Sequence, residues 1–355
     1  MTDEIRYGVI GTGMMGCEHI RNIAAIDGAR VTALADPNER PRHWGLKSCP
    51  EDRQPEVFAD YRDLLAADLC DVVVIASPNF THRDVLDAVF ETDLHVMVEK
   101  PMCTTMADCR HVVERARLHK GIFWVGLEYR YMPPTNAFLR ELAAGAVGNL
   151  KMLSIREHRF PFLVKVDNWN RFSRNTGGTL VEKCCHFFDL MNLATGSEAV
   201  SVFASGGQDV NHLDEVYDGE VPDILDNAYV IVEYANGCRA HLDLCMFAES
   251  SRDEQEICAV GDTGKLEIRI PSAVMTKGVR ATREIEESRV PENPAIRFQG
   301  LHHGASYLEH LDLIEAITSG GQAKVTALDG LRSVAIGVAA HRAIEEKRVV
   351  QMNEI

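Results

Sequence analysis

Residues 5–36 begin with Ile5-Arg-Tyr-Gly-Val-Ile10, continue through Gly11-Thr-Gly13-Met-Met-Gly16, and end with Val31-Thr-Ala-Leu-Ala35-Asp36. The first and last of these segments are short apolar runs, which are typical of buried strands. A helical spacing of apolar residues separates the glycines from the second run. The stretch therefore predicts a strand, a glycine turn, a helix and a second strand that ends at an acid.

Each glycine of this turn has a physical role in a dinucleotide site. Gly11 permits a tight turn, Gly13 lets the backbone approach a pyrophosphate, and Gly16 lets the helix pack closely on the strand. Met14 and Met15 begin the helix, whose free amide groups favour a phosphate. Asp36 lies twenty residues after Gly16, where a carboxylate can accept hydrogen bonds from the adenosine ribose. We expect NAD rather than NADP, because this carboxylate repels an additional phosphate.

Strands and helices keep alternating to about residue 125. Further apolar runs lie at residues 71–76, 94–98 and 122–125, with helical patterns between them. This alternation predicts an α/β fold, with an N-terminal doubly wound parallel sheet of the Rossmann type. Ligands bind beyond the carboxyl ends of such strands. Besides the glycine turn and Asp36, the polar residues at these ends are Ser77, Asn79, Glu99 and Lys100.

The pattern changes after about residue 128. Asn236-Gly237 is a strong hairpin signal between two segments in which buried-type and polar residues alternate. Such alternation is typical of an antiparallel sheet with one covered face. The sequence therefore predicts a C-terminal α+β domain with a large open, mainly antiparallel sheet.

A chain of 355 residues is long enough for two domains. We expect a Rossmann domain over residues 1–128 and a domain for substrate binding and oligomerisation over residues 129–355. The C-terminal helix, expected at residues 328–346, should pack back on the first domain. An exposed sheet face needs a cover, and we expect a homodimer or homotetramer formed through the open sheet.

Composition excludes several classes of protein. The chain has 37 basic and 53 acidic residues, giving a net charge of −16, so we expect no nucleic-acid partner. Its apolar runs stop far short of the roughly 18 residues of a membrane span, and its N-terminus lacks the pattern of a signal peptide. Ten cysteines without a Cys-x-x-Cys pair predict reduced thiols in a cytoplasmic protein, and no metal site.

Two places supply groups for alcohol chemistry, in which a base removes the hydroxyl proton and a cation stabilises the oxygen. Lys100 follows a strand end and precedes Pro101; the alternative is a surface lysine. Glu182 and His186 are four residues apart on a helix predicted from Thr179, as its cap, to about residue 193. A carboxylate beside a histidine raises its proton affinity. An exposed ion pair or a core histidine is the alternative.

With these residues the sequence resembles the Gfo/Idh/MocA family, which includes glucose–fructose oxidoreductase and inositol dehydrogenase. The resemblance covers nearly the whole chain. Its motifs are the glycine turn, Asp36-Pro37, Ala76-Ser-Pro-Asn79 with His82, Glu99-Lys-Pro101, and the glycine-rich helix start leading to His186.

The resemblance implies that His186 accepts a proton and that Lys100 contacts the cofactor and the substrate oxygen. We expect Ser77, Asn79, His82 and Glu99 to lie at the cofactor site with Lys100. The family's Asp-x-x-x-His pair is matched by Glu182, whose side chain is one methylene longer. Cys184 stands where a glycine is common in the family. These departures leave the role of His186 intact but change the geometry of the pair.

The expected substrate is a small polyol: a cyclitol, a sugar or a glycoside. Trp169 offers a surface for stacking on a sugar ring, and Asn168, Arg156 and His158 offer polar contacts. A core or interface position is the alternative for Trp169. Two other functions fit the same architecture, although a sensor would not need the proton acceptor of the set Lys100, Glu182 and His186. One is a glycosidase that retains NAD and oxidises its substrate transiently, and the other is a non-catalytic regulator that senses NAD.

Overall fold

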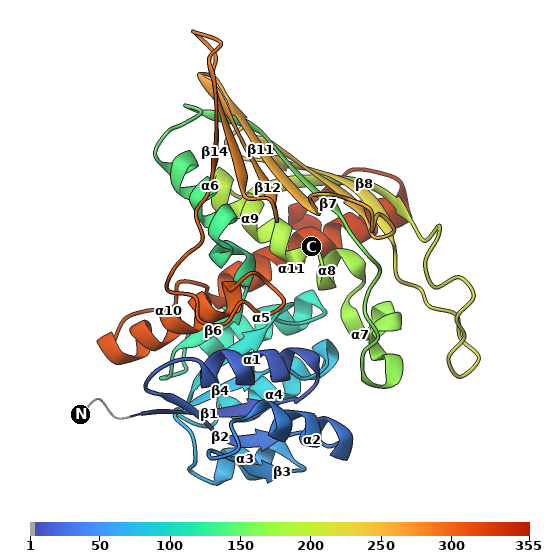
Figure 1. The fold of residues 1–355 in the computed structure, drawn as a ribbon. Helices are drawn as coiled ribbons and strands as arrows, with labels where there is room; N and C mark the ends of the chain where they lie inside the picture. Colours follow the sequence, from blue (N-terminus) through green and yellow to red (C-terminus); the bar gives the residue numbers. More distant parts are fainter. Residues whose placement is uncertain (1–3) are drawn as a thin grey trace. The chain divides into compact units, whose positions relative to one another are not determined.

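The computed structural model describes residues 4–355, and contacts within the chain divide it into two compact units (Figure 1). Each unit gathers three separate stretches. Unit 1 contains the chain up to Tyr131 with Lys165–Trp169 and Pro294–Leu331. Unit 2 contains Met132–Val164, Asn170–Asn293 and Arg332–Ile355.

Unit 1 is built on a six-stranded sheet in the order β3-β2-β1-β4-β5-β6, in which all neighbours run parallel. All four residues of β4 are buried, because helices cover a doubly wound sheet on both faces. The predicted Rossmann-type sheet is confirmed. Its strands are β1 (Ile5–Ile10), β2 (Ala29–Ala35), β3 (Glu56–Phe58), β4 (Val72–Ile75), β5 (His95–Glu99) and β6 (Phe123–Gly126).

The helices of unit 1 form two groups. Helix α1 packs beside α2 and α10, whereas α4 packs beside α3 and α5. The sequence analysis missed α2, because Trp44 and Leu46 are its only large apolar residues. The helices are α1 (Met14–Ala24), α2 (Glu39–Ser48), α3 (Tyr61–Ala66), α4 (His82–Val89), α5 (Met106–Ala116) and α10 (Ala305–Ser319).

Unit 2 is built on a nine-stranded sheet in the order β14-β13-β12-β11-β7-β10-β9-β8-β15. Its neighbours run antiparallel except for β7 and β10, so the predicted open and mainly antiparallel sheet is confirmed. Asn236-Gly237 turns the chain between β9 and β10, as the sequence predicts. The strands are β7 (Leu150–His158), β8 (Ala199–Gly207), β9 (Asn227–Tyr234), β10 (Arg239–Cys245), β11 (Gln255–Gly261), β12 (Gly264–Ile270), β13 (Val274–Val279), β14 (Ile285–Arg289) and β15 (Val350–Gln351).

The two faces of this sheet differ. On β9, Val230 and Val232 are buried, whereas Tyr229 and Ile231 are 60% and 42% exposed. Helices α6 and α9 lie along the covered face (Figure 1). The helices with residues in unit 2 are α6 (Pro133–Ala143), α7 (Ser173–Thr176), α8 (Thr179–Glu182), α9 (Cys185–Thr195) and part of α11 (Ala327–Glu346).

The single helix predicted from Thr179 to about residue 193 is wrong. Helix α8 ends at Glu182 and α9 begins at Cys185. Between them the amide of Cys184 lies 3.4 Å from the carbonyl oxygen of Thr179, five residues back, which is wider than α-helical spacing. The break contains Lys183, whose side chain turns to the sheet. In the described part of the chain, residues 4–355, no helix is long and apolar enough to cross a membrane.

Candidate active site

The glycine turn follows the carboxyl end of β1. Gly11 has φ +88°, and a Cβ atom there would lie 2.5 Å from the backbone nitrogen of Ser77. A Cβ atom on Gly16 would lie 2.0 Å from the carbonyl oxygen of Gly11. In contrast, a Cβ atom on Gly13 would have no atom within 4 Å. Two glycines therefore allow close backbone contacts, and the middle one faces open space.

Asp36 ties the end of β2 to this turn. Its carboxylate accepts hydrogen bonds from the backbone amides of Thr12 and Asn38, both at 2.9 Å. Arg42 donates to the carbonyl oxygen of Asp36 at 2.7 Å. The structure therefore brings Asp36 and the glycine turn together at one sheet edge, as predicted from their spacing.

The edge fits a dinucleotide. Helix α1 has no acidic residue in its first turn and no side-chain cap, so its amide groups are available to a phosphate. Met14 lies exposed at its start and Met15 is half-buried. The side-chain nitrogen of Asn79 and the hydroxyl of Thr12 are buried, and neither has a hydrogen-bond partner among the described residues. Both groups are therefore available to bind a polar ligand.

Lys100 is half-buried directly after β5. Its backbone amide donates to Oε2 of Glu99 at 3.1 Å, and Oε1 of Glu99 lies 2.8 Å from Nε2 of His19 on α1. On the other side of Lys100, the carbonyl oxygen of Pro101 lies 3.0 Å from Nδ1 of His82. The Nε2 atom of His82 lies 3.0 Å from the carbonyl oxygen of Ser77. Buried histidines thus contact both neighbours of Lys100.

A chain of polar side-chain contacts runs from Glu99 through His19 to His310 on α10. Nδ1 of His19 lies 2.9 Å from Nε2 of His310, and both rings are buried. Burial opposes charge on Glu99, but the hydrogen bond and charge of His19 outweigh it and lower the pKa of Glu99 to about 2. Burial likewise opposes charge on His19, yet Glu99 raises the pKa of His19. The pKa of His310 is well below its usual value, chiefly because of burial. The sequence analysis missed His19 and His310, which belong to no motif and could have been found only from burial in the fold.

In unit 2, the candidate acid and base lie on α8 and α9. Glu182 and His186 are both buried, with 5% and 2% exposure. Gly178, rather than the predicted Thr179, caps α8; its φ of +85° and the close ring of His341 leave no room for a side chain. Nε2 of His341 accepts a hydrogen bond of 3.1 Å from the backbone amide of Leu180. This contact fixes the start of α8.

The candidate substrate residues separate into two groups. Arg156 and His158 alternate with the buried Glu157, so they lie on the opposite face of β7 from the helices. There Arg156 pairs with Glu256 at 3.0 Å and His158 with Asp243 at 3.1 Å. The structure does not bring these two residues together with His186, because strand alternation turns their side chains away from the face that the helices cover. Their spacing in the sequence did not show which face of the sheet they would occupy.

Asn168 and Trp169 belong to the segment of residues 165–169 that clusters with unit 1. The ring of Trp169 meets that of Phe80 edge to face, with centroids 6.3 Å apart. Phe80 follows Asn79 directly and is 47% exposed. The structure therefore brings Trp169 beside the loop that also contains Asn79.

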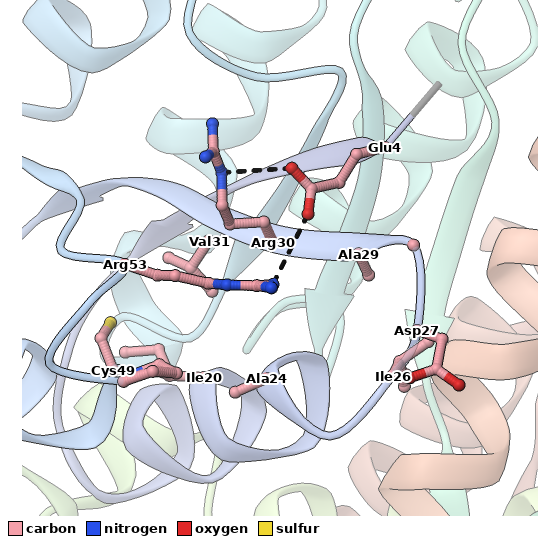
Figure 2. Close-up of a pocket in the computed structure, with 12 residues that line it drawn as sticks. Glu4, Ile20, Ala24, Ile26, Asp27, Ala29, Arg30, Val31, Cys49 and Arg53 are labelled. Carbon is pink, nitrogen blue, oxygen red and sulfur yellow. Dashed lines mark ion pairs between the residues drawn. The ribbon is translucent and has the colours of Figure 1, made fainter. Parts of the chain in front are cut away.

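A separate hollow lies at the opposite, amino-terminal edge of β1 and β2 (Figure 2). Glu4 pairs there with Arg30 at 3.5 Å and with Arg53 at 3.7 Å. Because the glycine turn follows β1 and lies at the carboxyl ends of these two parallel strands, this hollow is not part of the dinucleotide edge. Its lining includes Ile20, Ala24, Ile26, Val31 and Cys49.

Comparison with known proteins assigns both parts of the chain to one family. Residues 5–127 match the NAD-binding Rossmann fold of the Gfo/Idh/MocA oxidoreductase family, and residues 140–352 match its C-terminal α/β domain. A myo-inositol 2-dehydrogenase of Thermotoga maritima is 28% identical over 99% of both chains. Inositol 2-dehydrogenase 1 of Saccharopolyspora erythraea is 26% identical over 98% of this chain and 96% of its own.

A solved structure supports the same fold. Levoglucosan dehydrogenase in complex with NADH superposes with a TM-score of 0.85 at 18% identity, covering 98% of this chain and 99% of that one. The two family domains together span most of the 355 residues, and the first of them binds NAD. The chain therefore belongs to the Gfo/Idh/MocA oxidoreductase family and is an NAD(P)-dependent oxidoreductase that acts on CH–OH groups.

Proposed function

We propose that this chain is an NAD-dependent dehydrogenase that oxidises a secondary hydroxyl of a cyclitol, sugar or glycoside. The observation that carries the proposal is the position of Lys100 in unit 1. It follows β5 at the sheet edge that also holds the glycine turn, Asp36 and the available donor of Asn79. The inositol dehydrogenases among the relatives support the substrate class.

Bound NAD supplies the acceptor for a hydride. In the proposed mechanism Lys100 stabilises negative charge on the substrate oxygen, as a cation does at a developing alkoxide. His186 accepts the hydroxyl proton and Glu182 orients its ring. Trp169 and Asn168 are proposed to contact the polyol, since an aromatic ring stacks well on the apolar face of a sugar.

The first experiment measures NADH formation when purified protein is mixed with NAD and a panel of inositols, free sugars and glycosides at mildly alkaline pH. We expect absorbance at the NADH band with one or a few members of the panel. Silence from a folded, NAD-binding protein would overturn the proposal. If the protein then copurified with NAD and cleaved a glycoside without net NADH, it would be a glycosidase instead.

The role of His186 is tested by His186→Asn. Loss of proton transfer should lower kcat by about two to four orders of magnitude while NAD binding is kept. The matched control is His43→Asn, because His43 is exposed on α2. Near-normal turnover of His186→Asn would exclude His186 as the proton acceptor.

We also propose that the open face of the unit 2 sheet pairs with a second copy of the chain, giving a homodimer or homotetramer. Phe203 on β8 pairs in register with Ile231 on β9, and the Tyr229 ring stacks on His241 of β10 at 5.8 Å. Phe203, Tyr229 and Ile231 expose 44%, 60% and 42% of their surface. An exposed apolar patch of this kind favours protein association.

A further inference from the structure

We propose that His19 and His82 are positioning residues for Lys100: they hold its two chain neighbours and thereby fix the lysine relative to helices α1 and α4. The inference rests on the proposed function only in giving Lys100 a task. The contacts themselves lie within unit 1.

His19 acts through the residue before Lys100. Its Nε2 atom lies 2.8 Å from Oε1 of Glu99, and the other oxygen of Glu99 accepts the Lys100 amide at 3.1 Å. The carboxylate thus bridges the ring of His19 to the backbone of the lysine. His310 holds the opposite side of the same ring at 2.9 Å, so the ring cannot rotate without losing both contacts.

His82 acts through the residue after Lys100. Its Nδ1 atom lies 3.0 Å from the carbonyl oxygen of Pro101, and its Nε2 atom lies 3.0 Å from that of Ser77. The ring is fully buried, and burial lowers the pKa of His82, so a neutral ring donates to one of these carbonyls at a time. Donation to Pro101 is the state that fixes the lysine turn.

The two histidines come from elements that also form the dinucleotide edge. His19 lies on α1, whose first turn follows Gly13, and His82 begins α4 directly after the loop of Ser77 and Asn79. Movement of either helix start would therefore be passed to Lys100 through a short, buried contact. A misplacement of about 1 Å at a reacting group can cost up to about 100-fold in rate.

Isosteric variants separate this role from simple packing. Glutamine places its side-chain amide near the Nε2 atom of histidine, and asparagine places it near Nδ1. At position 19 the contact to Glu99 uses Nε2, so His19→Gln should keep kcat within about threefold, whereas His19→Asn should lose about tenfold to 100-fold. At position 82 the contact to Pro101 uses Nδ1, so the order is reversed: His82→Asn keeps activity and His82→Gln loses it.

The expected result is that glutamine keeps activity at position 19 and asparagine keeps it at position 82. A double-variant cycle with Lys100 tests whether these effects act through the lysine. In a Lys100→Met background, none of the four histidine variants should lower kcat further, because they act only through the lysine. The matched control is His95→Asn, at the other end of β5, where Nδ1 accepts the amide of Ile122. It should leave kcat unchanged. The same order of Gln and Asn at both positions, or additive losses with Lys100→Met, would overturn the inference.

A second readout does not depend on turnover. Reductive methylation with ¹³C-formaldehyde labels the lysine amines, and Lys100→Arg identifies the resonance of Lys100. We expect this resonance to shift in His19→Asn and His82→Gln and to stay in His19→Gln and His82→Asn. If the panel of polyols is silent but the crossed shifts appear, the proposed function fails and the positioning inference stands. If turnover is normal but all four variants give the same resonance, the inference fails and the proposed function stands.

Discussion

The ammonium nitrogen of Lys183 lies 2.9 Å from Oε1 of Glu157, inside unit 2. Glu157 has no exposed surface and Lys183 is 5% exposed. Arg159 adds a second, longer contact to the same oxygen at 3.6 Å. Burial lowers the pKa of Lys183, although the charge of Glu157 opposes that shift. The pair joins β7 to the break between α8 and α9, next to Glu182 and three residues before His186.

Removing one member of this pair should destabilise the protein strongly. Lys183→Met leaves the buried Glu157 carboxylate with the longer contact to Arg159, and a broken buried pair typically costs about 3–5 kcal/mol. We expect the free energy of unfolding, measured in urea, to fall by about that amount.

The double variant Lys183→Met with Glu157→Leu is the control for the charge itself. It removes both charges and replaces them with apolar groups, so it should recover most of the lost stability. If the double variant were as unstable as the single one, packing rather than the unpaired carboxylate would explain the loss.

Two variants in the glycine turn should separate an effect on folding from an effect on NAD binding. Gly16→Ala should destabilise the protein, because its Cβ atom would lie 2.0 Å from the carbonyl oxygen of Gly11. Gly13→Ala should keep the melting temperature, since its Cβ atom meets nothing within 4 Å, but should weaken NAD binding by about tenfold or more by occupying the space of the pyrophosphate. Melting curves with and without NAD check both variants. Full NAD affinity in Gly13→Ala would mean that the cofactor does not approach this glycine.

The sequence predicts unit 1 well because its signals are local. The glycines, the apolar runs and Asp36 follow one another within 32 residues, and parallel-strand geometry brings their ends to one edge. The structure places these residues at one edge as predicted: Asp36 accepts a hydrogen bond from the amide of Thr12, and Gly11 approaches the backbone of Ser77.

Features that depend on distant contacts could not be predicted in this way. His19 and His310 are 291 residues apart, so no spacing relates them. Lys183, at the break between α8 and α9, pairs with Glu157, a residue on a strand well before it in the chain. Arg156 and His158 lie on the strand that precedes the candidate base in the sequence, but strand alternation places them on the far face of β7.

Asp36 should set the choice between NAD and NADP. Asp36→Asn keeps a side-chain oxygen for the backbone amide of Thr12 and removes the negative charge that opposes a 2′-phosphate. We expect the ratio of NAD to NADP affinity, measured by titrating each cofactor, to fall by about tenfold to 100-fold, as one charged hydrogen bond is worth about 1.5–3 kcal/mol. Asp36→Glu, which keeps the charge, is the control and should retain a preference for NAD. An unchanged ratio in Asp36→Asn would show that another group makes the choice.

The proposed pairing through the open sheet predicts a change in assembly. Ile231→Asp adds a charge at the centre of the patch that includes Phe203 and Tyr229, and a buried unpaired charge is strongly unfavourable. Light scattering after gel filtration should show a smaller species than the wild type at the same concentration. Leu118→Asp, at a position 83% exposed in unit 1, is the control. A wild-type protein that is already monomeric would contradict the pairing.

His341 should make the stability of the protein depend on pH. Its Nε2 atom accepts the amide of Leu180, so the ring must be neutral there, and burial is the main reason that its pKa is lowered to about 4. Between that value and about 6.5, the usual pKa of histidine, the unfolded chain binds a proton at this residue and the folded chain does not. The contribution of His341 to stability therefore falls as the pH falls through this window, with a slope approaching about 1.4 kcal/mol per pH unit.

His341→Gln offers an oxygen to the same amide without titrating. We expect the unfolding free energies of the two proteins, measured in urea between pH 7.5 and 4.5, to diverge in favour of the variant as the pH is lowered. His43→Gln, which changes an exposed histidine, should follow the wild type; parallel curves for His341→Gln and the wild type would mean that the folded protein protonates His341 as readily as the unfolded chain does.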